Sequence, residues 1–166
     1  MVKLTGTLIF KQDKTVRNHA PDLFLRSSDL PIHCDIVSQD RSLFSGDADM
    51  VIAPGSEGLL GILPHHTPLL TTLTYGVLVV KQAGGEEAFA IAGGIMEVLP
   101  DAVTVLADVG ERVEEIDVAR AEAAKARAEE MLKHAPDQNN EAYLKAMTSL
   151  RRSQLRLDAA RRYRKG

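Results

Sequence analysis

The sequence predicts an α+β fold, in which an N-terminal antiparallel β-sandwich is followed by a C-terminal antiparallel hairpin of two helices. Apolar residues recur with a period near two from Pro31 to Asp108, glycine and proline interrupt this pattern, and the period becomes helical after Asp108. No helical crossover separates the expected strands, so a parallel sheet is disfavoured. We expect an N-terminal extension over residues 1–29, a β-sandwich over 30–109 and a helical hairpin with a basic tail over 110–166.

The N-terminal extension lacks a clear period. Its apolar run, Leu8-Ile9-Phe10, is too short for the core of a secretory signal. Asp13, Asp22 and Asp29 do not fit the acid-poor composition of a mitochondrial presequence. We expect a mobile extension that contains at most a short strand.

Short apolar segments between Pro31 and Asp108 are the expected strands. They cover residues 32–37, 49–53, 76–82, 88–92, 95–99 and 103–106. The turn signals between them are Asp40-Arg41-Ser42, Pro54-Gly55, Ala83-Gly84-Gly85-Glu86, Gly93-Gly94 and Pro100-Asp101. The third of these signals separates two strand patterns and predicts a β-hairpin. Short strands at this spacing are typical of a sandwich or a barrel.

Two helical patterns follow the strands. The first repeats at three- and four-residue spacings through Ala121, Ala124, Ala128 and Leu132. The second consists of Tyr143, Met147, Leu150, Gln154 and Leu157. Proline and asparagine between residues 134 and 140 end the first helix, which predicts an antiparallel hairpin. Because the first face is rich in alanine, it buries little apolar area. Two alternatives follow: the hairpin opens or leaves the sandwich at modest cost, or it stays packed at all times.

Composition excludes several classes of protein. The chain has 166 residues, of which 45% are hydrophobic and 26% are charged, and this balance excludes a wholly disordered chain. No segment approaches the roughly 20 consecutive apolar residues that a membrane helix needs. Cys34 is the single cysteine, so it forms no internal disulfide, and we expect it to be a buried thiol.

Charge is distributed unevenly along the chain. Residues 145–166 contain eight basic residues and one acidic residue, a net charge of +7, whereas the rest of the chain has a net charge of −10. Such a tail either meets an acidic partner or forms a solvated helix face. A nucleic-acid-binding adaptor is one alternative, but the acidic body and the small aromatic content, 4% of the chain, count against it.

The sequence contains no convincing motif for catalysis or metal binding. Phosphate-binding and dinucleotide-binding glycine patterns are absent, and Gly55-Ser56-Glu57-Gly58 lacks the spacing of a nucleophile elbow. His65 and His66 are adjacent, which is not the usual spacing of zinc ligands. We expect no catalytic residues and no metal site. A small sandwich-fold enzyme would need a polar pocket that no motif supplies.

Acidic residues gather before the first helix. They are Glu111, Glu114, Glu115 and Asp117. Carboxylates at this place stabilise the positive end of a helix dipole. Arg152 and Arg156 lie one turn apart on the second helix and share a face, and guanidinium groups are well suited to phosphates. Solvated helix faces and a site for a polyanion both remain open on charge alone.

The chain resembles a known family in the segment Gly58-Leu59-Leu60-Gly61-Ile62-Leu63-Pro64-His65-His66-Thr67-Pro68-Leu69-Leu70. This segment is similar to the Gly-x-x-Gly-Ile-Leu-Pro-x-His-x-Pro-Leu pattern of bacterial F-type ATP synthase epsilon subunits. The similarity also covers residues 44–46, 92–98, 103–108 and 116–121. It implies a β-sandwich with a helical hairpin, and a non-catalytic subunit on the central rotor stalk of a proton-transporting ATP synthase. It also implies a peripheral position on the cytoplasmic face of the bacterial cell membrane.

The resemblance implies partners for both parts of the chain. The sandwich would contact the gamma subunit and the ring of c subunits through Leu59, Gly61, His65, His66 and Pro68. The family commonly has glutamate at the position of Leu59, so an apolar contact would replace a polar one here. The C-terminal helices would reach the alpha/beta catalytic head and inhibit ATP hydrolysis. The residues implied to meet acidic loops of the beta subunits are Arg151, Arg152 and Arg156.

ATP is implied as a regulatory ligand, and no cofactor is required. The family motif Ile/Leu-Asp-x-x-Arg-Ala is present as Ile116-Asp117-Val118-Ala119-Arg120-Ala121. The ATP-binding positions implied by the resemblance are Glu111, Ile116, Asp117, Arg120, Ala121, Arg127, Arg152 and Arg156. ATP bound only to the folded-down hairpin would stabilise that state by RT ln(1 + [ATP]/Kd), about 2.7 kcal/mol at a hundredfold excess over Kd.

Overall fold

The structure, a computed structural model, describes residues 31–134 and 140–164. The extension expected over residues 1–29 lies outside this part of the chain. The strands are β1 (Ile32–Ser38), β2 (Ser42–Ala48), β3 (Met50–Gly55), β4 (Gly58–Ile62), β5 (Leu69–Gln82), β6 (Gly85–Val98), β7 (Ala102–Ala107) and β8 (Gly110–Arg112). A 3-10 helix, η2 (Val113–Glu115), leads to the α-helices α1 (Val118–His134) and α2 (Glu141–Tyr163).

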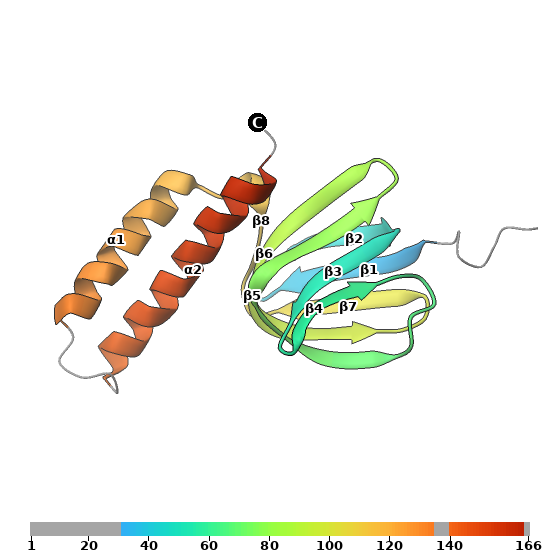
Figure 1. The fold of residues 1–166 in the computed structure, drawn as a ribbon, viewed down its shortest axis with the longest axis horizontal. Helices are drawn as coiled ribbons and strands as arrows, with labels where there is room; N and C mark the ends of the chain where they lie inside the picture. The colour runs from blue at the N-terminus through green and yellow to red at the C-terminus, as the bar shows by residue number, and fades with distance from the viewer. Residues whose placement is uncertain (1–30, 135–139, 165–166) are drawn as a thin grey trace, which may run out of the picture.

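The strands form one sheet in the order β2-β1-β7-β6-β5-β3-β4, and β8 pairs with β6. Figure 1 shows this sheet curled around its interior, with the two helices side by side and α2 lying between α1 and the strands. The β-sandwich followed by a two-helix hairpin is therefore confirmed.

One strand pair corrects the expectation of a purely antiparallel sheet. β1 and β7 are parallel, with Cys34 opposite Val103 and Ile36 opposite Val105. A parallel pair needs a long crossover connection, and that connection is usually a helix. Here the strands from β2 to β6 themselves supply the crossover. The expectation is wrong because it considered helical crossovers alone.

Three short strands, β2, β4 and β8, lie where the sequence pattern predicts none, and β8 falls within the range expected for the helical hairpin. β2 pairs with β1, placing Phe44 opposite Ile36, and β4 pairs with β3. Pro54 and Gly55, expected as a turn, instead end β3. The register between β3 and β5 shifts at this point, and such an irregularity tolerates proline because no regular ladder bond is lost.

Gly93 and Gly94 correct another expected turn, because they continue β6. Their φ angles are +91° and +132°, and a Cβ atom at Gly94 would lie 2.3 Å from the backbone oxygen of Leu106. At this point β6 approaches β7 so closely, and with such φ angles, that only glycine fits. The hairpin expected between β5 and β6 is confirmed, with Gln82 opposite Gly85.

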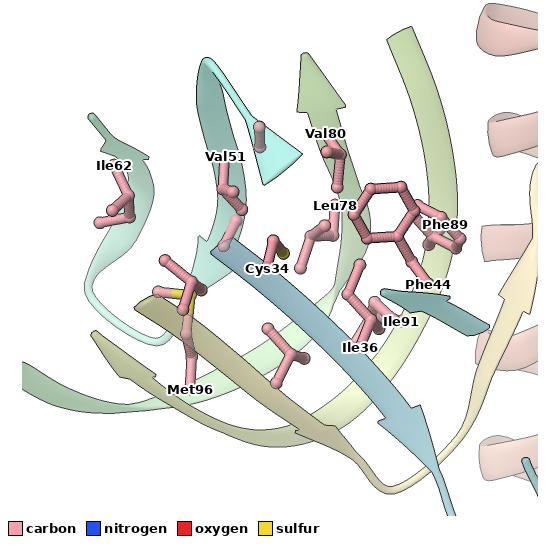
Figure 2. Packing of buried hydrophobic residues seen from close by; sticks show 14 of the residues in the cluster. Cys34, Ile36, Phe44, Val51, Ile62, Leu78, Val80, Phe89, Ile91 and Met96 are labelled. Atoms are coloured by element: carbon pink, nitrogen blue, oxygen red, sulfur yellow. The ribbon is translucent and has the colours of Figure 1, made fainter. Parts of the chain in front are cut away.

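The core of the sandwich is aliphatic, with one aromatic pair. Figure 2 shows Cys34, Ile36 and Leu78 packed among strands that also carry Phe44 and Phe89. The rings of Phe44 and Phe89 meet edge to face, with centroids 6.0 Å apart. Such a pair stabilises the folded state beyond the contribution of the apolar area that the two rings bury.

Cys34 is fully buried, and its burial raises the pKa of the thiol from 9.0 to about 12, with the charge of Asp35 adding to the shift. A thiol whose pKa is higher in the folded state stabilises the fold below pH 9 and loses that contribution as the pH rises toward 12. We expect the unfolding free energy of the wild type to fall, relative to that of Cys34→Ala, by about 1 kcal/mol per pH unit above pH 9. Urea titrations at pH 8 and pH 10.5 measure this, and parallel pH profiles would contradict it.

The helices pack on each other through small residues. α1 buries Ala121 and Ala128, with Ala124 and Leu132 half-buried, so its expected face is confirmed. The face expected on α2 is only partly correct. Its buried residues are Ala146, Ser153, Ala159 and Ala160, while Tyr143, Met147, Leu150 and Leu157 are half-buried and Gln154 is exposed. Because α2 contacts α1 on one side and the sheet on the other, small residues occupy its closest approaches.

A second apolar cluster joins α2 to the sheet. It consists of Ala90, Val113, Ile116, Ala159 and Ala160, with Leu155 and Tyr163 at its edge. α2 packs against β5, β6 and η2, whereas the main partner of α1 is α2. The hairpin is thus attached to the sandwich mainly through α2, by an alanine-rich contact that buries little apolar area per residue.

Candidate functional site

A pocket of about 300 Å³ lies where the sandwich meets the helical hairpin. We call it the junction pocket, and its lining residues are Glu111, Glu115, Asp117, Arg120, Ala121, Ala124, Arg127 and Arg156. These residues come from β8, η2, both helices and the short link before α1. The pocket therefore exists only while α2 is packed against the sandwich.

The local sequence explains how the link before α1 is fixed. Asp117 precedes the helix, and its carboxylate Oδ1 accepts a hydrogen bond of 2.9 Å from the backbone N–H of Arg120. This is the geometry of an N-cap, which satisfies a backbone donor that the first turn of a helix leaves free. Ile116, one residue earlier, is buried in the apolar cluster beneath the pocket. Together the two residues set where the first turn of α1 begins.

Two arginines pair with the acidic residues of the pocket. Nε of Arg156 donates to Oε2 of Glu111 at 2.6 Å, and both side chains are about one-third exposed or less, at 33% and 25%. Arg41, from the turn between β1 and β2, pairs with Glu115. All three carboxylates of the junction pocket are thus engaged by a cation or a backbone donor.

Arg120 and Arg127 supply the remaining positive charge. Within residues 31–134 and 140–164, their guanidinium groups have no ion pair or hydrogen bond. Arg152 lies beside the pocket, in a groove of about 500 Å³ between α1 and α2 that also includes Arg156. Nε of Arg152 is buried and has no hydrogen-bond partner in the described part of the chain. The region therefore presents guanidinium donors that other protein groups do not use.

The structure brings together six of the eight implied ATP-binding residues in one pocket: Glu111, Asp117, Arg120, Ala121, Arg127 and Arg156. Arg152 lies in the adjoining groove, and Ile116 supports the pocket from below. Sequence reasoning assigned Glu115 only to the helix dipole, and it placed Arg41 only in an expected turn. No local signal could reveal their pairing, because 74 positions separate them.

The implied partner-binding residues fall at two places around β4. Leu59 is 76% exposed and lines a groove of about 420 Å³ with Tyr75 and Tyr163. His65 lies in the turn after β4, and its backbone N–H donates to the oxygen of Pro100 at 2.7 Å. Gly61 is in β4 itself, while His66 and Pro68 lie between β4 and β5.

An apolar stripe missed by the sequence reasoning crosses the outer face of β5, β6 and β7. It consists of Leu70, Ile95 and Leu106, which are 71%, 44% and 50% exposed. Ile95 lies opposite both Thr72 and Leu106 in the ladder, so these side chains share one face. Exposed apolar side chains that gather on one face commonly mark an interaction surface. The alternation of residues in these strands indicated that they have two different faces. It did not indicate which face is buried in the core and which is exposed.

Neither a metal cluster nor a membrane span stands out in the described residues. They contain no group of three or more histidine, cysteine, aspartate or glutamate side chains that could hold a metal ion. None of the described helices is long and apolar enough to cross a membrane.

Two family models match the chain. The ATP synthase delta/epsilon chain β-sandwich domain matches residues 31–113, and the ATP synthase delta/epsilon chain long alpha-helix domain matches residues 114–161. The matches follow one another along the chain and meet at η2. The chain therefore belongs to the delta/epsilon family of ATP synthase subunits.

Within this family, curated relatives that resemble the chain include bacterial ATP synthase epsilon chains. That of Dehalococcoides mccartyi is 49% identical over 133 residues, which cover 79% of this chain and 93% of the relative. That of Bordetella avium is 45% identical over 136 residues, which cover 81% of this chain and 95% of the relative. The resemblance to bacterial epsilon subunits is confirmed.

A solved structure shows the same fold. It is a chain in the cryo-EM structure of the Euglena gracilis mitochondrial ATP synthase, comprising OSCP, F1 and the c-ring. The TM-score is 0.67 at 21% sequence identity, and the match covers 92% of this chain and 90% of the other.

Proposed function

We propose that this chain is the epsilon subunit of a rotary, proton-translocating ATP synthase and forms part of its central stalk. The sandwich binds the gamma subunit and the c ring, and the helical hairpin regulates ATP hydrolysis. The chain itself catalyses no reaction and requires no cofactor, and ATP is its regulatory ligand. In a bacterium this role places it peripherally, on the cytoplasmic face of the membrane.

The apolar stripe is the observation that carries the stalk role. Leu70 is 71% exposed at a sheet surface, and Ile95 and Leu106 lie on the same face. Burial of a leucine side chain contributes about 1.5–3 kcal/mol, so a rigid sheet that presents three such side chains fits a permanent partner. The gamma subunit fits this surface, and we assign Leu59 and the turn after β4 to the contact with the c ring.

The hairpin is suited to regulation because it is held to the sandwich mainly by α2, through an alanine-rich contact. Of the three arginines proposed to meet the beta subunits, only Arg151 is exposed while the hairpin is packed. Arg152 is half-buried, and Arg156 is paired with Glu111. All three become available together only when α2 leaves the sheet, so the inhibitory contact and the packed state exclude each other.

The junction pocket is suited to the phosphates of ATP. Arg120 and Arg127 have no partner in the described residues, and guanidinium groups bind phosphate oxygens through paired, charge-assisted hydrogen bonds. The pocket contains residues from both the sandwich and the hairpin, so a ligand bound there stabilises the packed state. Low ATP then favours the released hairpin, which blocks hydrolysis and conserves the ATP that remains.

Binding to gamma tests the stalk role. We expect Leu70→Asp to weaken binding to purified gamma subunit by at least about tenfold, because it places a charge where the proposed contact would bury an exposed apolar side chain. Leu144→Asp is the matched control, since Leu144 is 56% exposed but lies on α2 near the tip of the hairpin. Titration calorimetry measures both affinities. Equal affinities of Leu70→Asp and the wild type would contradict the proposed surface.

A further inference from the structure

Arg41 does not line the junction pocket, but it forms an ion pair with Glu115, which does. It lies in the turn between β1 and β2, and its guanidinium group pairs with the carboxylate of Glu115 in η2. The two side chains are 51% and 44% exposed, so their charges are partly screened by water. Among the described residues that precede β8, Arg41 alone forms an ion pair with a residue of the pocket.

The charges of the pocket show why this pair matters. Three carboxylates and three arginines line it, so the lining by itself is formally neutral. Glu111 is paired with Arg156, and Asp117 accepts the backbone N–H at the start of α1. Glu115 has one cationic partner among the described residues, and that partner is Arg41. With Arg41 included, the pocket and its immediate surroundings carry a net positive charge.

We infer that Arg41 determines the affinity of the junction pocket for polyphosphate anions by neutralising Glu115. This inference rests on the proposed role of ATP as the ligand of the pocket. An unpaired Glu115 would repel the phosphates that Arg120 and Arg127 attract, because like charges a few ångströms apart oppose each other. Arg41 is thus a positioning residue that acts through Glu115 and need not touch the ligand.

Four forms of the full chain test the inference by ATP titration calorimetry: the wild type, Arg41→Ala, Glu115→Gln and the double variant. We expect Arg41→Ala to weaken ATP binding by about fivefold at low salt, with a smaller effect at high salt. Glu115→Gln binds ATP at least as tightly as the wild type, because it removes the repulsive charge. The double variant recovers the affinity lost in Arg41→Ala, because the carboxylate that this substitution leaves without a cationic partner is gone.

The same four forms distinguish neutralisation of the charge of Glu115 from a purely structural role, in which Arg41 holds η2 in position. If Arg41 merely held η2 in place, Glu115→Gln would break that hold as well and would weaken binding as much as Arg41→Ala. That result, or an unchanged affinity of Arg41→Ala, overturns the inference. Equal thermal midpoints of the four forms exclude unfolding as the cause of any difference.

Titration with inorganic tripolyphosphate separates the inference from the proposed function. If the wild type binds tripolyphosphate with the expected pattern but does not bind ATP, then the ATP ligand is wrong and the role of Arg41 stands. If ATP binds and Arg41→Ala has no effect with either probe, the role of Arg41 is wrong and the proposed function stands. If neither anion binds the wild type, the role of Arg41 and the proposed ATP ligand are both overturned, while the stalk role is tested separately by binding to gamma.

Discussion

Replacing Arg127 by alanine is expected to weaken ATP binding by about tenfold to a hundredfold, because a hydrogen bond to a charged group contributes about 1.5–3 kcal/mol. Arg127 lines the junction pocket and has no partner among the described residues, so the substitution removes a proposed phosphate ligand without leaving a buried carboxylate unpaired. Its backbone lies in the middle of α1, where alanine is the most favourable residue. Titration calorimetry of the full chain measures the change.

Arg151→Ala is the matched control for this prediction. Arg151 is also a helical arginine, but it is exposed and does not line the pocket. Both variants lose one positive charge, so a nonspecific effect of net charge would weaken both to the same extent. Equal losses of affinity would show that the junction pocket has no specific part in nucleotide binding.

Gly94→Ala has the largest expected effect on stability. The φ angle of Gly94 is +132°, and an added Cβ atom would lie 2.3 Å from the backbone oxygen of Leu106 and 2.8 Å from the Cα atom of Ala107. Both neighbours are backbone atoms of β7, so the clash is relieved only by moving one strand away from the other. Backbone strain and overpacking each cost about 1–3 kcal/mol, which gives a loss of roughly 2–6 kcal/mol in the free energy of unfolding.

Gly84→Ala provides the comparison for Gly94→Ala. Gly84 lies in the hairpin turn between β5 and β6, and no heavy atom would lie within 4 Å of an added Cβ. We expect its unfolding free energy to stay within about 0.5 kcal/mol of the wild type, as for ordinary surface substitutions. Urea denaturation measures both variants, and a Gly94→Ala protein as stable as Gly84→Ala would refute the close packing of β6 on β7.

The periodicity of the sequence was sufficient to predict a β-sandwich followed by a helical hairpin, but not the order and pairing of the strands in the sheet. The alternation of apolar and polar residues, together with the glycine-containing turns, located most strands and the β5–β6 hairpin. They failed at Gly93 and Gly94, because a glycine pair marks a turn and a close strand contact equally well. They failed again at the β1–β7 pair, since strand order depends on contacts between distant segments.

The helices show a similar limit. The face of α1 around Ala121 and Ala128 was predictable because it has one packing partner. α2 packs on two sides, so its most buried positions, such as Ser153 and Ala159, do not follow the largest apolar residues. Large side chains such as Leu157 instead lie half-buried between the two contacts.

The candidate site was predictable where its residues are close in sequence. The link from Glu111 to Ala121 and the pair of arginines on α2 were visible as charge patterns. The pairing of Arg41 with Glu115 depends on the fold, which brings the turn after β1 next to η2. The balance of charge in the pocket therefore became apparent only from the structure.

Amide hydrogen exchange of the full chain, with and without saturating ATP, tests most directly whether nucleotide in the junction pocket holds the hairpin against the sandwich. At ATP a hundredfold above Kd, linkage predicts that exchange through hairpin release slows by about a hundredfold in α1 and α2. Exchange in the sandwich core around Ile36 and Phe89 is expected to change little, and Arg127→Ala at the same ATP concentration should resemble the nucleotide-free wild type. If ATP binds but leaves the exchange of both helices unchanged, nucleotide does not control the hairpin.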